Sequence, residues 1–166
     1  MEKVKIAVIV PVYKAEKFLE RCLDSILNQT LKEIKVICVD NASPDNCGAI
    51  LKKYAAEDDR IVVITHKENM GPSVSRNDGL DYVYNNIPEA EYIAFVDADD
   101  KIEPDTYETV YNEGIKSQAD IVNFNFLPST YWSYKTVPTT EPVDYKGNCL
   151  RAIFDNEQFY TFVVCW

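Results

Sequence analysis

The stretch from Glu91 to Asp105 reads EYIAFVDADDKIEPD, and it decides the fold. Its first part, Tyr92–Val96, is short and rich in β-branched and aromatic residues, which is typical of a buried strand. The apolar pattern stops at Asp97, Asp99 and Asp100, whose carboxylates repel one another and are costly to desolvate without partners. The sequence therefore predicts a buried strand that ends in an acidic turn.

The acidic turn has two interpretations. Carboxylates that alternate along a turning backbone can converge on a hard divalent cation, and Mg²⁺ or Mn²⁺ prefers such oxygen ligands. Aspartate-rich turns are also common on protein surfaces, so the cluster can equally be a solvated turn. Ligands of open α/β sheets bind outside the carboxyl ends of the strands. The choice between the two interpretations therefore depends on what else reaches that end of the sheet.

The composition predicts one folded α/β domain. The chain has 166 residues, of which 46% are hydrophobic and 12% aromatic. Its formal net charge of -10 argues against a broad nucleic-acid footprint, so no nucleic-acid partner is expected. The five cysteines lack zinc-type spacing, which favours a reducing, cytoplasmic location, and no apolar run is long enough for a transmembrane segment.

Strand and helix patterns alternate along the chain. The expected strands are Val4–Val10, Ile34–Val39, Ile61–Thr65, Tyr92–Val96 and Ile121–Phe126. Helices are expected over 17–29, 44–56, 73–84 and 103–118, with Ser43 and Ser73 as N-caps and Pro11 ending the first strand. This order predicts a three-layer α/β/α domain with a mostly parallel sheet.

Four parts of the sequence are expected to meet at one edge of this sheet. They are Pro11–Tyr13 after the first strand, Asp40 and Asn41 after the second, Asp97–Asp99 after Tyr92–Val96, and Arg76 at the start of a helix. A carboxylate can accept from a base or ribose, an acidic pair can hold a metal, and arginine can neutralise a phosphate. Because no glycine-rich phosphate loop is present, metal and arginine would have to hold the phosphates of a nucleotide.

The chain resembles the nucleotide-binding half of family 2 glycosyltransferases with the GT-A fold. The resemblance rests on four segments in order, which are VIVPVYKAEKFLERCLDSILNQT, VICVDNASPDN, ENMGPSVSRNDGL and EYIAFVDADDKIEPD. It implies a nucleotide-diphospho-sugar transferase fold that is C-terminally truncated. Residues 1–127 would form the nucleotide-sugar-binding core, and 128–166 an insertion and the incomplete start of the acceptor-binding half.

The resemblance implies a role for each residue at the shared edge. Three residues would line the base and ribose pocket, namely Pro11, Val12 and Tyr13. Asp40 and Asn41 occupy the place of an Asp-Asp pair that contacts the base, and Asn41 would accept a hydrogen bond from a uracil N–H. The D-x-D motif is Asp97, Ala98 and Asp99, with Asp97 nearer the ribose, Asp99 on Mn²⁺ or Mg²⁺, and Arg76 near the base or diphosphate.

The implied activity is metal-dependent transfer of a sugar from a nucleotide donor, expected to be a UDP-sugar, to an acceptor hydroxyl with inversion. Relatives of this kind serve polysaccharide biosynthesis with saccharide or lipid-linked acceptors, so the resemblance implies a cytoplasmic full-length protein that can associate with a membrane. No match to the family's general base occurs before Trp166, so the catalytic residue is unassigned and donor binding alone is expected of this chain. The alternative is a non-catalytic nucleotide-sugar-binding or interaction domain.

Two further interpretations concern single features. A sugar-nucleotide nucleotidyltransferase is disfavoured because the loop after the first strand, PVYKAEKF, has no glycine. His66 is the single histidine, which leaves a histidine-based triad little support, and we interpret it as an ordinary loop residue.

Overall fold

The computed structural model describes residues 3–123 and 162–165. The strands are β1 (Ile6–Val12), β2 (Ile34–Asp40), β3 (Ile61–Thr65), β4 (Tyr92–Phe95), β5 (Ile121–Asn123) and β6 (Phe162–Cys165). The helices are α1 (Leu19–Leu27), α2 (Cys47–Glu57), α3 (Pro72–Asn86) and α4 (Thr106–Ser117).

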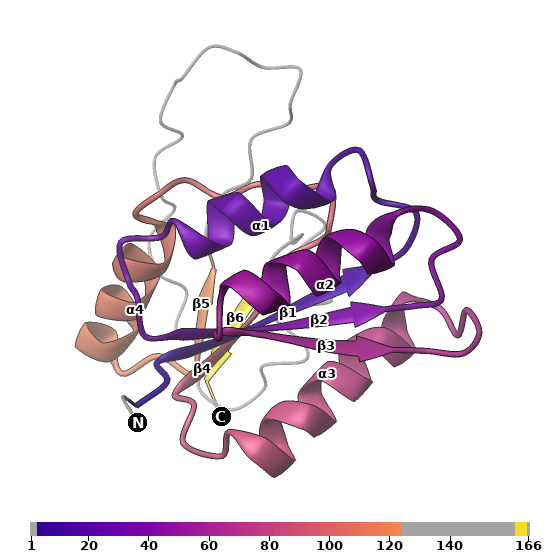
Figure 1. Ribbon diagram of the computed structural model, residues 1–166. Coiled ribbons are helices and arrows are strands. Elements are labelled where there is room, and N and C mark those ends of the chain that lie inside the picture. The colour runs from indigo at the N-terminus through magenta and orange to yellow at the C-terminus, as the bar shows by residue number, and fades with distance from the viewer. Residues whose placement is uncertain (1–2, 124–161, 166) are drawn as a thin grey trace.

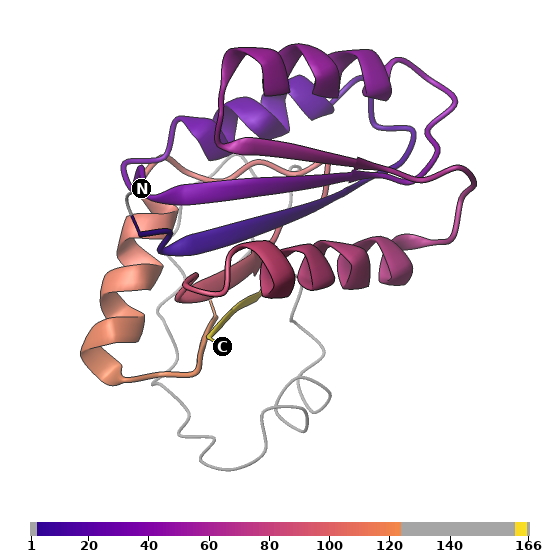
Figure 2. The ribbon, with the colours of Figure 1, turned by 60° about the horizontal axis from the view of Figure 1, so that its bottom comes forward.

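The strands form one sheet in the order β3-β2-β1-β4-β6-β5. The pairs β3–β2, β2–β1 and β1–β4 are parallel, whereas β6 runs antiparallel to both β4 and β5. Helices α1 and α2 lie on one face of the sheet and α3 lies on the other (Figures 1 and 2). The three-layer α/β/α arrangement with a mostly parallel sheet is therefore confirmed.

The central strands are apolar on both sides because each side faces a helix layer. Ile6, Val8 and Val10 of β1 belong to the core beneath α1, α2 and α4, and they are fully buried. Ala7 and Ile9 point the other way into the core beneath α3. The continuous apolar run in β1 thus supplies two cores at once.

The first strand extends further than the sequence pattern indicated. Pro11 lies within β1, although we expected it to end the strand. The Ile9 carbonyl accepts from Val96 N–H on the β4 side, and the Val12 carbonyl accepts from Asn41 N–H on the β2 side. Residues alternate between these sides, so Pro11 faces the β4 side beyond the last ladder pair, Ile9 with Phe95. A missing N–H costs no ladder bond there.

Several helix boundaries also differ from the expected ones. Helix α3 begins at Pro72 with Gly71 as N-cap, so Ser73 does not cap it and Arg76 lies in its second turn. Helix α2 begins at Cys47, because Ser43 donates its N–H to the Asp40 carboxylate in a turn instead of capping the helix. Such local hydrogen bonds compete with helix formation. Helices α1 and α4 are shorter than expected at both ends.

Strand β6 was not predicted from the sequence. The strand expected over Ile121–Phe126 is present as β5 over Ile121–Asn123, and residues 124–126 lie outside the described residues. The insertion expected over 128–166 lies, except for β6, outside the described residues, so its boundary stays a prediction.

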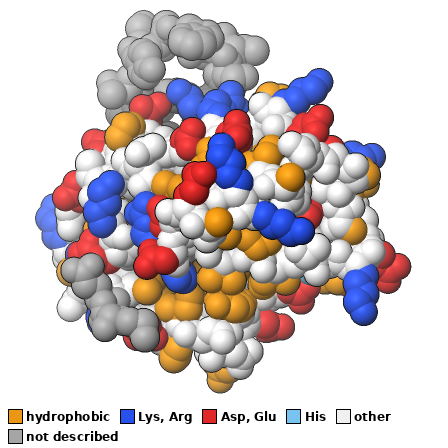
Figure 3. Space-filling model, in the orientation of Figure 1, with side chains coloured by type: hydrophobic (Ala, Val, Ile, Leu, Met, Phe, Trp, Pro, Cys, Tyr) orange, Lys and Arg blue, Asp and Glu red, His pale blue; other side chains and the backbone are white. Residues whose placement is uncertain are grey.

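Charged side chains of both signs are interspersed over the face of the molecule in Figure 3, where no stripe of one sign is visible. Among the described residues, no helix has the length and apolar character that crossing a membrane requires.

Candidate functional site

The loops that follow β1, β2 and β3 all leave the same end of the sheet, at the right of Figure 1. A cavity of about 430 Å³ opens there. It is lined by Pro11, Val12, Tyr13, Lys14, Ala15, Phe18, Asn41, Asn69, Pro72, Ser75, Arg76, Asp97, Ala98 and Asp99. The structure thus brings together eight of the nine residues that the sequence proposed for the nucleotide and metal sites.

The ninth residue, Asp40, does not line the cavity. This residue ends β2 and is only 5% exposed. One carboxylate oxygen accepts from the N–H of Ser43, and a side chain added at Gly48 would meet the other at 3.4 Å. Asp40 therefore stabilises the turn after β2. Its position outside the cavity lining does not favour direct contact with a base.

An ion pair joins the two sides of the cavity. Arg76 Nη2 on α3 donates to Asp97 Oδ1 at 2.5 Å. The Arg76 side chain is 33% exposed and that of Asp97 is 47% exposed, so both remain accessible to a ligand. The pair holds a cation and an anion in one place, where they could meet the phosphates and hydroxyls of a nucleotide.

The acidic loop after β4 is held by two residues of α1 and by one residue just beyond its C-terminus. Arg21 donates to the backbone carbonyl of Asp99 at 2.6 Å, and Ser25 Oγ accepts from the backbone N–H of Ile102 at 3.2 Å. The third member, Gln29, is fully buried and donates to the Glu103 carbonyl at 2.6 Å. Arg21 and Ser25 are spaced four residues apart on one face of α1, and Gln29 follows just beyond its C-cap, so the three fix the loop at successive points.

The chemistry of this loop suits a divalent cation that is shared with a ligand. Asp97 and Asp99 both line the cavity. Burial and then the charges of Asp99 and Asp97 raise the pKa of Asp100, the effect expected where carboxylates are crowded. No group of three possible ligand side chains that could hold a metal by itself occurs within the described ranges. Mg²⁺ is commonly bound by one or two carboxylates together with substrate phosphates.

Asn41 also lines the cavity, and its side-chain amide contacts three partners from the loop between β3 and α3. The residue is 3% exposed, and its Oδ1 accepts from the backbone N–H of Met70 at 2.9 Å. Its Nδ2 donates to Asn69 Oδ1 at 3.0 Å. His66 also contacts Asn41, since Nδ1 lies 3.0 Å from Oδ1. His66 therefore lies in a loop, as expected, and its side chain contacts a residue that lines the cavity.

Tyr13 lies at the outer rim, where it is 41% exposed. A hydrogen bond with the Asn69 side chain, and then one with Lys14, lowers the pKa of the Tyr13 hydroxyl. The Lys14 ammonium group also lies 5.2 Å from the centre of the Tyr13 ring. Tyr13 is thus attached to the polar network of the cavity wall instead of merely packing.

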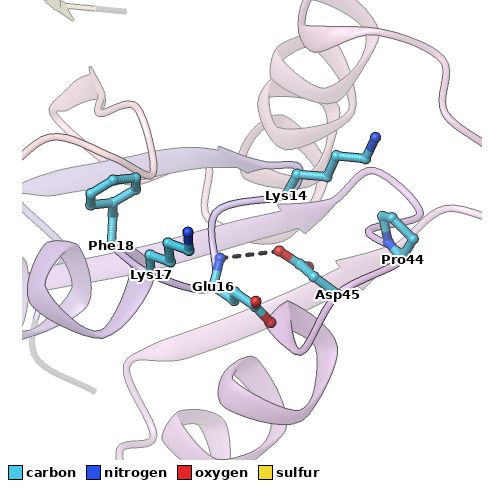
Figure 4. Close-up of a pocket in the computed structure, with 6 residues that line it drawn as sticks. All are labelled: Lys14, Glu16, Lys17, Phe18, Pro44 and Asp45. Atoms are coloured by element: carbon cyan, nitrogen blue, oxygen red, sulfur yellow. Dashed lines mark hydrogen bonds between the residues drawn. The ribbon is translucent and has the colours of Figure 1, made fainter.

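A second hollow of about 500 Å³ adjoins the cavity and shares Lys14 and Phe18 with it. Figure 4 shows the Asp45 carboxylate pointing toward the backbone nitrogen of Glu16. The Glu16 N–H donates to Asp45 at 3.1 Å, and the Asn46 N–H donates back to the Glu16 carboxylate at 2.9 Å. These bonds lock the loops after β1 and β2 together and so fix one wall of the site.

Sequence reasoning missed part of the site. Asn69 and His66 lie in the loop between β3 and α3, and the spacing of that loop gives no sign that its polar groups turn inward. Gln29 occupies a helix end, where a polar residue is ordinarily solvated. A usable signal existed only for Asn69, which belongs to the quoted segment ENMGPSVSRNDGL.

Comparison with known proteins identifies the class of this domain. The family model for glycosyl transferase family 2 matches residues 7–166. The chain therefore belongs to glycosyl transferase family 2, as the four sequence segments indicated.

Individual relatives agree with this assignment. The chain is 45% identical over 122 residues to the glycosyltransferase GlyA of Streptococcus pneumoniae, covering 74% of this chain and 17% of that protein. It is 35% identical to a poly(ribitol-phosphate) beta-glucosyltransferase of Bacillus spizizenii, covering 86% of this chain and 23% of that protein. The chain thus spans less than a quarter of the length of these two relatives.

A solved structure shares the fold. S. aureus TarS in complex with UDP superposes with a TM-score of 0.64 at 30% identity, covering 75% of this chain and 38% of that chain. The mannosyltransferase PcManGT of Pyrobaculum calidifontis, at 24% identity and a TM-score of 0.51, covers 60% of this chain and 28% of its own length. The GT-A fold is therefore confirmed.

Proposed function

We propose that this chain is the donor-binding part of an inverting glycosyltransferase that takes a UDP-sugar and a divalent cation. The observation that carries the proposal is the meeting of Asp97, Asp99 and Arg76 with the end of β1 in one cavity. The TarS complexes with UDP and UDP-GlcNAc support a nucleotide-sugar donor.

The chain's own residues would act on the donor in distinct ways. Pro11, Val12 and Tyr13 would hold the base and ribose, and Arg76 would approach the diphosphate while its partner Asp97 faces the ribose. Asp99, with Asp97, would hold Mn²⁺ or Mg²⁺, which when bound neutralises charge that develops on the departing diphosphate. Inversion needs a base that deprotonates the acceptor hydroxyl. No residue between 3 and 123 is assigned that role.

The division of the chain follows from this proposal. Residues 1–127 would form the donor-binding core, and 128–166 would begin the half that binds a saccharide or lipid-linked acceptor in polysaccharide synthesis. Cytoplasmic action is supported by the free thiols of Cys22, Cys38 and Cys47. Because this chain spans a small share of its relatives, transfer by these residues alone is expected to be weak or absent.

The test is calorimetric titration of UDP, GDP, dTDP and CMP, each with Mn²⁺ and again with EDTA. We expect UDP to bind in the presence of Mn²⁺ and its affinity to fall at least about tenfold when EDTA is added. The variant Asp99→Asn should lose the metal-dependent part. Asp59→Asn removes the same charge at a distant exposed turn and should bind as the wild type does. Binding of UDP that is indifferent to both EDTA and Asp99→Asn would contradict the metal role.

A non-catalytic binding domain is the competing function. It predicts the same titration but no sugar release by any longer form of the protein. Hydrolysis or transfer of a UDP-sugar by a form extended beyond Trp166, abolished by Asp99→Asn, would exclude it.

A further inference from the structure

The side-chain amides of Asn41 and Asn69 have a fixed orientation. Backbone N–H groups can only donate, so an amide atom that faces one must be the oxygen. Met70 N–H faces Asn41 Oδ1 at 2.9 Å, and Gly71 N–H faces Asn69 Oδ1 at 2.9 Å. Neither amide can be flipped without placing an NH₂ group against a backbone donor.

His66 occupies the remaining acceptor capacity of Asn41. Its Nδ1 lies 3.0 Å from Asn41 Oδ1, and because that atom is an oxygen, Nδ1 must carry the hydrogen and donate. The other ring nitrogen, Nε2, lies 2.8 Å from the Asp78 carboxylate on α3 without an aligned hydrogen bond. The imidazole side chain is only 6% exposed. The ring therefore lies between α3 and Asn41, with Nδ1 toward Asn41.

A carbonyl oxygen has two lone pairs, and both of those on Asn41 Oδ1 are now engaged, one by Met70 and one by His66. Asn41 lines the cavity, yet it has no acceptor left for a ligand. Of its two amide hydrogens, one is donated to Asn69. The second makes no hydrogen bond within the described part of the chain. Toward a ligand, Asn41 can therefore only donate.

Hydrogen bonds are donated in the same direction from Asn41 toward Asn69 and the rim of the cavity. Asn69 Oδ1 accepts from both Asn41 and Gly71, so Asn69 can offer Tyr13 only its NH₂ group. A donated hydrogen bond to the Tyr13 oxygen agrees with the lowered pKa of that hydroxyl. From His66 through Asn41 to Asn69, each side-chain hydrogen bond is thus donated outward, toward the rim where Tyr13 lies.

We infer that His66 sets the base specificity of this site by turning Asn41 from an acceptor into a donor, so that the pocket selects a pyrimidine carbonyl oxygen. This inference rests on the proposed function, and it replaces the expectation that Asn41 accepts from a uracil N–H. His66 is a positioning residue in this scheme, because it acts through Asn41 and does not touch the ligand.

The first test asks whether one substitution weakens or strengthens UDP binding. In Asn41→Asp the donor is lost, and a carboxylate oxygen is placed against Asn69 Oδ1. We expect UDP to bind about tenfold more weakly in the presence of Mn²⁺, the size of one hydrogen bond lost. If Asn41 accepted from the base N–H, the added negative charge would strengthen binding. Tighter UDP binding by this variant would overturn the inference.

The second test separates recognition from loss of structure. UDP is compared with 2-thio-UDP and 4-thio-UDP, in which one carbonyl oxygen at a time becomes a weaker acceptor. We expect one analogue to bind wild type about fivefold more weakly than UDP. In Asn41→Asp that ratio should fall close to one, because the bond that senses the oxygen is absent. Equal binding of all three nucleotides by wild type, or an unchanged ratio in the variant, would overturn the inference.

His66 is tested by a matched pair. Asparagine can place its NH₂ group where the Nδ1 hydrogen stands, whereas leucine cannot donate. His66→Asn should bind UDP within about twofold of wild type and keep the thio ratio, and His66→Leu should lose about fivefold. Equal behaviour of the two variants would contradict the assignment. Absence of UDP binding by wild type would instead defeat the proposed function, and so the two failures are distinguishable.

Discussion

At the scale of single residues, burial decides the chemistry of the cysteines. Burial raises the pKa of Cys22 to about 12, and burial together with a hydrogen bond to Asp45 raises that of Cys47 to about 11. The pKa of the fully buried Cys38 is also raised by burial. The thiolate is the reactive form of cysteine, so a raised pKa keeps these side chains in the unreactive neutral state near pH 8.

This predicts slow alkylation of the native protein. Peptide mapping after iodoacetamide treatment at pH 8 should find Cys22, Cys38 and Cys47 largely unmodified, and unfolding in guanidinium should make all three react. Rapid native labelling of Cys22, whose Sγ lies against the Asp97 carbonyl at 3.5 Å, would mean that the acidic loop opens frequently.

At the scale of elements, one glutamine connects α1 to the loop that carries the candidate metal ligands. Gln29 Nε2 donates to the carbonyls of Ser25 and Glu103, and Gln29 Oε1 accepts from the N–H of Tyr107. Replacement by methionine keeps the length but leaves these buried backbone groups without a partner. We expect Gln29→Met to lower the free energy of unfolding by about 3 kcal/mol, measured by urea denaturation.

The matched control is Lys52→Met on the exposed face of α2, which should change stability by less than about 0.5 kcal/mol. Since the loop begins at Asp97, Gln29→Met should also weaken metal-dependent UDP binding. A variant as stable as wild type would show that the Gln29 bonds are replaced by water.

Two helical glycines, Gly79 and Gly48, differ in the space that a side chain would find. A Cβ at Gly79 of α3 would lie 2.5 Å from Ile9 Cγ2 of β1, whereas one at Gly48 of α2 would meet only Asp40 Oδ2 at 3.4 Å. Alanine is the better helix former by up to about 1 kcal/mol. Gly79→Ala should nonetheless destabilise the domain by about 2 kcal/mol, because the helix must move away from the sheet.

Gly48→Ala should be neutral or slightly stabilising in the same thermal denaturation experiment. The opposite order of the two melting temperatures would mean that α3 packs less closely on β1 than the structure shows.

The helices and strands differ in how well the sequence pattern predicted them. Periodicity located β1 to β4 and all four helices because their apolar residues recur at strand or helix spacing and pack into the two cores. Helix starts were placed wrongly where a polar side chain had another partner, as Ser43 has in Asp40. Strand β6 was not predicted because antiparallel insertion between β4 and β5 depends on partners distant in sequence.

At the scale of the whole molecule, ligand binding should stabilise the fold, since the cavity is built from the ends of β1, β2 and β4 and from α3. With Mn²⁺ and UDP at about one hundred times the dissociation constant, the gain should be about 2.7 kcal/mol, seen as a higher melting temperature. Chelation of the metal with EDTA should reverse the shift, and Mn²⁺ without nucleotide should produce little of it. A shift that survives EDTA would contradict metal-linked binding.

The sequence by itself determined the parallel part of the sheet, the family and the rim residues, because strand periodicity and the order of four motifs are local properties of the chain. Only the tertiary structure decided what those residues offer a ligand. Asp40 turned out to shape a loop, and Asn41 became a donor because His66 and Met70 occupy its oxygen. Whether a polar side chain can bind a ligand depends on the hydrogen-bond partners that other loops bring to it. The tertiary structure determines which partners those are.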